Sequence, residues 1–436
     1  MQTNLAPKYK NTPEGQEAEA ILRKCVHCGF CQATCPTYQV LGDELDSPRG
    51  RIYLVKQVLE GAEITEKTRT HLDRCLTCRN CETTCPSGVQ YGHLVDIGRK
   101  IVEENTQRSL TEKLTRKALT EGLASSLLPA GMAIGRALKP LMPAALKKKM
   151  VGKRPPGEWP TGTHARKVIL LDGCVQPSML PSIDAATARV LDAVGVQSVV
   201  VPKSGCCGAL RFHMNEQEAG LADMRRNIDA WLPLIEGGQV EALVMNASGC
   251  GATVREYGHH LKHDPAYATK AQRVSELTQD VGEYLAQFAD ALAQKIAAKT
   301  RPHPTPLPHA GEGDPSLALP QAGEGVAAVF HPPCTLQHWQ QLKGVTEGLL
   351  ANCGVQLKPF NESHLCCGSA GAYSVLQPEI ATQLRDRKLG NLQAAKPDVI
   401  LSANIGCLTH LQSGTDTPVI HWIEWVDRQL SAGLSN

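Results

Sequence analysis

The sequence has 436 residues, of which 17 are cysteines, 15 are histidines and only 4% are aromatic, and its formal net charge is +2. Near-neutral charge argues against an extended basic face for nucleic acid, since each phosphate contact needs a Lys or Arg, and no run approaches the roughly 20 apolar residues that cross a bilayer. The amino-terminal stretch lacks the apolar core of a signal peptide, so we expect a reducing cytoplasmic location, where 17 thiols indicate metal or redox chemistry instead of disulfides.

The first eight cysteines form two near-copies of one motif, CVHCGFCQATCP from Cys25 and CLTCRNCETTCP from Cys75. Both copies fit C-x2-C-x2-C-x3-C-P, the bacterial pattern for a four-iron cluster, and in two-cluster ferredoxins the fourth cysteine binds the other cluster. We therefore predict two [4Fe-4S] clusters, one on Cys25, Cys28, Cys31 and Cys85, and the other on Cys75, Cys78, Cys81 and Cys35.

Zinc is the alternative metal for these motifs, because structural zinc sites also use C-x2-C pairs. Two quartets that each end in Cys-Pro favour clusters over zinc, and His27 inside the first motif is interpreted as a solvent-facing spacer. Residues 47–61 and 92–104 carry apolar side chains at helical spacing, and hairpin signals are missing. Residues 1–105 are therefore predicted to form an α-helical ferredoxin domain.

Residues 106–165 are predicted to be a basic helical connector. Its stretch 122–157 contains no Asp or Glu, but it carries seven Lys and Arg residues among leucines. One interpretation is contact with an anionic membrane surface, which would place the protein peripherally at the inner face of the cytoplasmic membrane. The other is a connector that packs on the body of the protein, because Pro129, Pro140 and Pro143 prevent one long amphipathic helix.

From residue 166 onward, short β-branched runs alternate with helical ones, and the pattern occurs twice, in 166–299 and in 327–436. The predicted strands are KVILLDG, QSVVVP and EALVMNAS, and then VAAVFHPP, VQLKPF and DVILSAN. Strands separated by helices form parallel sheets, in which the loops at the carboxyl edge meet in a crevice. Residues 300–326 between the halves are a low-complexity tract, interpreted as a linker.

Eight further cysteines follow these strands at matching positions. Those of the second half lie 160 residues after those of the first, except for the last, which lies 157 residues after its counterpart, so the halves are an internal duplication. Each half offers four thiolates, which either bind an additional cluster or line a crevice for subunit docking. The two sets are Cys174, Cys206, Cys207 and Cys250, and Cys334, Cys366, Cys367 and Cys407; Cys353 falls opposite Val194 and is predicted to be a buried apolar residue.

A double four-iron motif followed by two Cys-Cys-Gly domains resembles the iron-sulfur subunits of glycolate oxidases. The resemblance implies an electron-transfer subunit that relays single electrons from FAD-containing 2-hydroxyacid dehydrogenase subunits towards a quinone or another acceptor. It also implies that the substrate binds another subunit, so that this chain has no catalytic residue. Related families include iron-sulfur subunits of anaerobic glycerol-3-phosphate dehydrogenase and lactate-utilisation complexes.

Two further functions remain as alternatives. A heterodisulfide-reductase-like catalytic subunit would act directly on a disulfide or quinone, but the relatives of that kind carry a C-x-x-C pair where this sequence has only Cys250 and Cys407. A non-redox scaffold would use its metals only to hold the fold. The sequence shows no glycine-rich dinucleotide motif and no Walker phosphate loop, which favours an electron conductor over a flavin or nucleotide enzyme.

Overall fold

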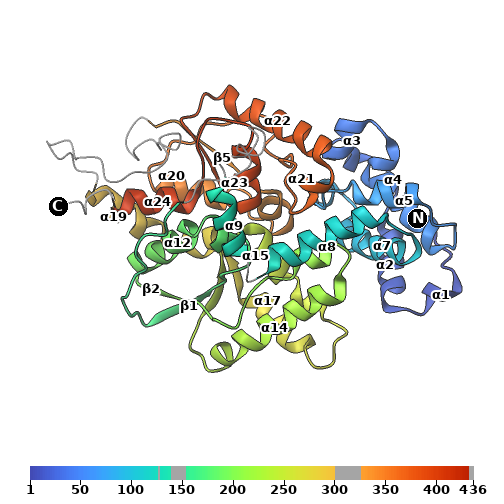
Figure 1. Ribbon diagram of the computed structural model, residues 1–436, viewed down its shortest axis with the longest axis horizontal. Coiled ribbons are helices and arrows are strands. Elements are labelled where there is room, and N and C mark those ends of the chain that lie inside the picture. Colours follow the sequence, from blue (N-terminus) through green and yellow to red (C-terminus); the bar gives the residue numbers. More distant parts are fainter. Residues whose placement is uncertain (126–127, 139–153, 300–325, 432–436) are drawn as a thin grey trace.

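The computed structural model describes residues 1–125, 128–138, 154–299 and 326–431, which form a helical amino-terminal part and two α/β halves. In Figure 1 the helical part (blue) lies at one end of the molecule, and the first half (green to yellow) and the second half (orange to red) lie next to it. This arrangement confirms the predicted fold class, an α-helical ferredoxin domain followed by two repeated α/β domains with parallel sheets.

The amino-terminal part is built from helices, and its described residues contain no strand. Helices α4 (Pro48–Leu59) and α7 (Tyr91–Asn105) approach closely because Gly98 has no side chain, and a Cβ atom there would lie 2.5 Å from Val55. Ser47 begins α4 by accepting a hydrogen bond from Gly50 N at 3.0 Å. The other elements are α1 (Pro7–Lys10), α2 (Pro13–Lys24), η1 (Phe30–Gln32), α3 (Pro36–Leu41), η2 (Glu44–Asp46), α5 (Glu66–Asp73) and α6 (Asn80–Thr84).

Two helices, α8 (Leu110–Ala124) and α9 (Leu128–Ala137), connect the helical part to the first half. Arg136 of α9 donates to two carbonyl oxygens at 3.1 Å each, and Arg154 donates to Glu424 at 2.9 Å. These parts of the basic segment pack on the body of the protein, whereas its lysines between 139 and 153, and residues 300–325 of the predicted linker, lie outside the described residues. No helix in the described ranges has the length and apolar character that crossing a bilayer requires.

Each half contains a sheet whose strand pairs are all parallel. The strand order is β2-β1-β3-β4 in the first half and β5-β6-β7 in the second. The strands are β1 (Arg166–Leu170), β2 (Val196–Val199), β3 (Ala242–Met245), β4 (Thr278–Asp280), β5 (Ala328–His331), β6 (Val399–Ser402) and β7 (Val419–His421). The helices of the first half are α11 (Gln176–Met179), α12 (Ser182–Ala193), α13 (Ala209–His213), α14 (Gln217–Glu236), α15 (Ser248–Arg255), α16 (Tyr257–His260), α17 (Ala268–Leu277), α18 (Val281–Ala286) and α19 (Ala289–Lys299). Those of the second half are the π-helix η5 (Thr335–Trp339), α20 (Val345–Asn352), α21 (Tyr373–Leu376), α22 (Pro378–Ala394), α23 (Ile405–Gln412) and α24 (Trp422–Ser431).

The structure differs from the predicted strands in three places. The segment VQLKPF makes only a single parallel bridge, from Leu357 to Ala328, where β2 forms a full strand in the first half. Strands β4 and β7 were not predicted, because three residues are too few to show an alternating pattern.

The two halves pack on each other through two equivalent pairs of helices. Helix α12 of the first half packs on α24 of the second, and α18 of the first packs on α20 of the second. Residues of both halves consequently share one hydrophobic core, which includes Val168 and Leu191 from the first half and Ile400 and Trp422 from the second. Such mutual packing of duplicated units is the arrangement of a twofold dimer within one chain.

Candidate metal centres

Four cysteines of the helical part line one cavity. These are the first three cysteines of the first motif and the last cysteine of the second, namely Cys25, Cys28, Cys31 and Cys85. Cys28 is exposed, whereas Cys25 is buried, so this cavity opens to the surface on one side. His27 also lines the cavity, and it is half-buried with its Nε2 atom covered, which differs from the solvent-facing spacer expected from the sequence.

The complementary four cysteines line a second cavity. They are Cys35, Cys75, Cys78 and Cys81, and all four are buried. Cys81 lines the first cavity as well, so the two cavities share a wall. Apart from Cys81, which lines both cavities, the cysteines lie in the crossed arrangement that the two motifs predict, with Cys85 of the second motif at the first cavity and Cys35 of the first motif at the second.

The backbone of both motifs has the same unusual conformation. His27 and Gly29 in the first motif have φ values of 58° and 84°, and Thr77 and Arg79 at the same positions of the second have values of 50° and 55°. Left-handed residues between right-handed ones turn successive N–H groups toward one side, which creates a concave site for an anionic group. One such donor is Thr77 N, which lies 3.3 Å from the Cys75 sulfur.

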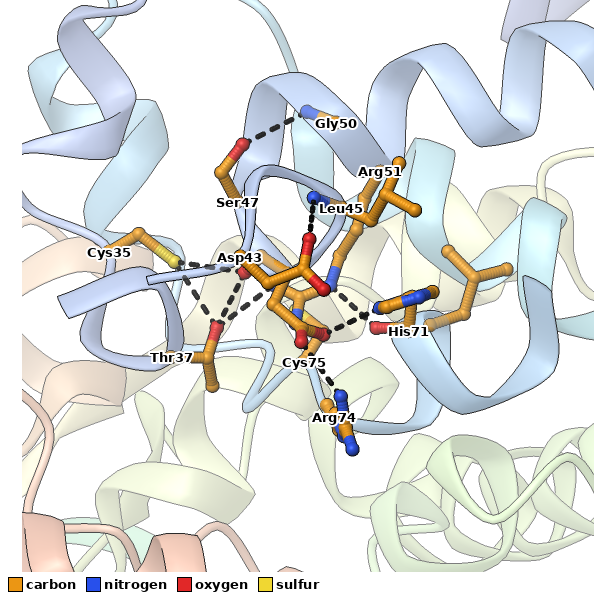
Figure 2. A network of polar contacts seen from close by, with 12 residues as sticks. Cys35, Thr37, Asp43, Leu45, Ser47, Gly50, Arg51, His71, Arg74 and Cys75 are labelled. Carbon is orange, nitrogen blue, oxygen red and sulfur yellow. Dashed lines mark hydrogen bonds and ion pairs between the residues drawn. The ribbon is translucent and has the colours of Figure 1, made fainter. Parts of the chain in front are cut away.

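A buried charge network lies beside the second cavity. Figure 2 shows Arg51, His71 and Arg74 pointing toward the same place, between α4 and α5. There the buried carboxylate of Asp46 accepts from Arg51 at 3.2 Å and from Arg74 at 2.9 Å, and His71 Nδ1 lies 3.1 Å from it.

Arg51 of this network also connects to a candidate ligand. Its Nη1 atom donates to Thr37 Oγ1 at 3.0 Å, and Thr37 Oγ1 lies 3.3 Å from the Cys35 sulfur. Burial would lower the pKa of Arg51, but the neighbouring Cys75, Tyr91 and Cys35 groups outweigh burial and raise that pKa. The guanidinium therefore stays charged next to the second cavity.

The first α/β half brings its four sulfurs together at the carboxyl ends of its strands. Cys174 follows β1, the Cys206-Cys207 pair follows β2, and Cys250 lies in the first turn of α15 after β3. Hydrogen bonds from the thiols of Cys174 and Cys207 lower the pKa of Cys206, and the bond between Cys207 and Cys250 continues the series. The predicted crevice therefore contains all four cysteines of this half.

The second half repeats this arrangement with one added residue. The Cys334 and Cys366 sulfurs lie 3.9 Å apart, and hydrogen bonds from Cys334 and Cys367 lower the pKa of Cys366. Cys407 contacts Cys367, and the imidazole of His331 lies beside both. No sequence motif indicated His331, although aligning the two halves would have placed it opposite Leu171, three residues before the first cysteine of each set.

The second half docks directly on the motif that lines the second cavity. Trp339 Nε1 donates to Thr77 O at 2.9 Å, and Tyr373 Oη donates to Arg74 O at 2.9 Å. Cys78 of the second cavity and Cys366 of the second half belong to one buried apolar cluster. Burial, and next the charge of Cys366, raises the pKa of Cys78, so the two sulfur sites are electrostatic neighbours.

The first half docks on the helical part through ion pairs. Arg79 forms a bidentate pair with Glu256, and its guanidinium lies 3.7 Å from the ring centroid of Trp339. Burial would raise the pKa of Glu256, but the hydrogen bond from His93 and the charge of Arg79 lower it. Arg79 therefore contacts both halves at once and fixes their position relative to the second motif.

Comparison with known proteins assigns these sites to known domains. The 4Fe-4S dicluster domain family matches residues 21–89, and the cysteine-rich domain family matches residues 168–255 and 328–412. The glycolate oxidase iron-sulfur subunit of Escherichia coli (strain K12) is 49% identical over 437 residues, which cover 99% of each chain. This chain belongs to the family of glycolate oxidase iron-sulfur subunits. Its dicluster domain carries two [4Fe-4S] clusters, and its role is iron-sulfur electron transfer.

Other relatives lie within and beyond the glycolate oxidase iron-sulfur subunits. The probable glycolate oxidase iron-sulfur subunit of Bacillus subtilis (strain 168) is 30% identical over 427 residues, covering 91% of this chain and 90% of the relative. Lactate utilization protein A of Bacillus pumilus (strain SAFR-032) is 24% identical over 246 residues, covering 56% of this chain and 90% of the relative. The last of these matches only part of the chain, so it is the more distant of the two.

The residues around both cavities fit iron-sulfur clusters. Each predicted set of four thiols lines one cavity, and Cys81 lines both. None of the 17 cysteines forms a disulfide, and thiolates are the ligands that such clusters require. Cys353 is not part of any of these sets, because it is 3% exposed within the shared core of the two halves.

Proposed function

We propose that this chain is the electron-transfer subunit of a flavin-linked 2-hydroxyacid dehydrogenase, with glycolate as the substrate oxidised on a partner subunit. The observation that carries this proposal is that Cys366 of the second half and Cys78 of the second cavity lie in one buried cluster, close enough that, besides burial, the charge of Cys366 raises the pKa of Cys78. Together with the wall that Cys81 gives to both cavities, this proximity makes one series of sulfur sites through the molecule. A series of neighbouring sulfur sites is suited to passing electrons from one site to the next, whereas a non-redox scaffold does not require its metal sites to be neighbours.

The proposed cluster ligands are the two sets that the cavities group together. Cys25, Cys28, Cys31 and Cys85 hold one [4Fe-4S] cluster, and Cys35, Cys75, Cys78 and Cys81 hold the other. Each bound cluster supplies one-electron chemistry, with a potential set by charge, hydrogen bonds and exposure. The chain contributes the charged Arg51 beside Cys35 and the N–H of Thr77 toward Cys75, both of which favour the more negative reduced state.

The electron donor is proposed to be an FAD-containing subunit, and the final acceptor a quinone or another acceptor. Two sequence features support this division of labour: the chain has no dinucleotide-binding motif of its own, and its relatives are named as subunits. A reduced flavin holds two electrons, so a partner of this kind needs a conductor that accepts them singly.

The test is anaerobic co-purification from the native source, followed by addition of glycolate to the complex. We expect a flavoprotein to co-purify and the visible absorbance of the clusters to bleach with glycolate. Lactate and glycerol 3-phosphate serve as comparison substrates, and faster bleaching by either would reassign the substrate. Bleaching that requires neither a flavoprotein nor a hydroxyacid, but occurs with a dithiol alone, would refute the proposal.

A further inference from the structure

His331 is a buried side chain that faces cysteine sulfurs. It is the last residue of β5, and only 1% of its surface is exposed. Within the described residues neither Nδ1 nor Nε2 of its ring has a hydrogen-bond partner of normal geometry, and the polar group that interacts with the ring is the Cys407 thiol. A ligand atom of the ring lies within 4.8 Å of the sulfurs of both Cys367 and Cys407, and those two sulfurs are equally close to each other.

Burial of an unsatisfied imidazole is costly unless the ring has another role. Leaving a buried polar group without a partner costs about 1–3 kcal/mol, and native proteins satisfy most such groups. A nitrogen atom and two sulfur atoms that lie this close together are the donor set that transition metals prefer. The neutral imidazole nitrogen is among the commonest metal ligands in proteins.

The first half provides an internal comparison. At the position that corresponds to His331, three residues before Cys174, it has Leu171, which is 4% exposed and packs in a hydrophobic core. The same fold therefore closes over an apolar side chain at this position, so packing does not require a histidine. The two crevices differ in the one residue that can add a nitrogen ligand.

We propose that the second crevice binds an iron-sulfur centre to which His331 contributes a ring nitrogen beside the sulfurs of Cys367 and Cys407. The identification of the metal as redox-active iron rests on the proposed electron-transfer function. Cys334 and Cys366 complete the donor set, with their sulfurs 3.9 Å apart. The first crevice, with Leu171 in the corresponding place, offers only thiolates.

His331 orders the two crevices by their affinity for electrons when it takes the place of one of the four thiolates on the iron. A centre with a neutral imidazole in place of an anionic thiolate is less negative than the all-thiolate centre of the first crevice, and histidine ligation raises the potential of iron-sulfur centres. The second crevice also lies beside the second cavity, because Cys366 and Cys78 belong to one buried cluster. A higher potential there makes this crevice the place where electrons leave the ferredoxin part.

The test uses the full chain, purified anaerobically after growth with ¹⁵N-labelled histidine. The readouts are iron, sulfide and zinc content and pulsed electron paramagnetic resonance of the reduced and oxidised protein. We expect more iron than two clusters contain and a strong hyperfine coupling to histidine nitrogen. In His331→Leu, which copies the first half, we expect that coupling to be lost and the iron of the second crevice to decrease.

The matched control is His410→Leu, because His410 lies three residues after Cys407 but its Nε2 atom already has a partner, Ala381 O at 3.1 Å. This variant should keep the coupling. If His331→Leu does not fold, His331→Cys is expected to retain the iron, lose the nitrogen coupling and lower the potential of the centre.

Three results would overturn the inference: a wild-type protein without coupling to histidine nitrogen, a coupling that persists in His331→Leu, or zinc in place of iron at this crevice. Failure here is distinguishable from failure of the proposed function. A chain with iron for only two clusters that is still reduced by glycolate through its flavoprotein would refute the His331 centre and leave the proposed function intact. A complex that shows the nitrogen coupling but is not reduced by a hydroxyacid would refute the proposed function and leave the His331 centre intact.

Discussion

Replacing Arg51 with methionine is expected to lower the potential of the cluster in the second cavity. Contacts of 3.0 and 3.3 Å connect Arg51 Nη1 to the Cys35 sulfur through Thr37 Oγ1, so these two atoms lie about 6 Å apart or less. At an effective dielectric constant of about 20, a unit charge at that distance is worth roughly 2–3 kcal/mol. For one electron this corresponds to a shift on the order of 100 mV to lower potential.

Arg51→Met also removes a buried donor group, so its effect on stability has to be measured together with the potential. The side chain is 1% exposed and donates to Asp46, Thr37 and the carbonyl of His71, and breaking a buried ion pair costs about 3–5 kcal/mol. Arg74 still pairs with Asp46 in the variant, which limits the loss.

The assay is a redox titration followed by electron paramagnetic resonance, with iron content and the melting temperature measured in parallel. Arg51→Lys keeps the charge and should shift the potential much less, and Asp46→Asn should shift it upward. Arg23→Met removes an exposed arginine of the same domain and should leave the potential unchanged. An Arg51→Met protein with full iron content and the wild-type potential would refute the electrostatic reasoning.

Three further outcomes are expected. Gly368→Ala should destabilise the second half by about 2–4 kcal/mol in thermal unfolding, because its φ is +88° and a Cβ would meet a backbone oxygen at 2.5 Å; Gly371→Ala, with open space around it, should cost about 1 kcal/mol. Burial lowers the pKa of His260 from 6.5 to about 3, so the unfolded chain binds the extra proton and stability should fall as pH drops below 6.5, by up to about 1.4 kcal/mol per pH unit. Urea unfolding at pH 7 and pH 5 should show a smaller decrease in His260→Gln, and equal decreases would contradict this. Arg79→Ala should cost about 1–3 kcal/mol, because it leaves the half-buried Glu256 without its arginine partner and with His93 as a remaining one, whereas the double variant with Glu256→Gln should recover part of that loss.

Local chemistry explains which features could be predicted from the sequence. The cysteine motifs could be recognised because three of the four proposed ligands of each cluster lie three residues apart, and β1, β3, β5 and β6 because their β-branched runs are buried. Strands β4 and β7 escaped prediction because each has only three residues. The cysteines of each α/β half are far apart in sequence. Their meeting could be predicted only from the repeated strand-cysteine pattern, because loops at the carboxyl edge of a parallel sheet gather in one crevice.

The functional residues that were not predicted are those whose role depends on tertiary contacts. Arg51 occurs in the sequence PRGR near the start of a helix, where an arginine is ordinarily exposed, and only the folded chain shows it covered by Asp46 and Thr37. His331 ends β5 and its counterpart Leu171 directly follows β1, and the ring of His331 stands out only when Cys367 and Cys407 are placed around it.

The crossed grouping of the two ferredoxin motifs has a consequence for how the protein matures. Each cavity takes its fourth thiol from the other motif, Cys85 in one and Cys35 in the other, so neither cavity is complete until both loops have come together. Assembly of the two clusters is thereby made interdependent, and a damaged cysteine in one loop impairs the centre built mainly by the other. Loading of the ferredoxin part should accordingly be all-or-none, with few chains carrying a single cluster.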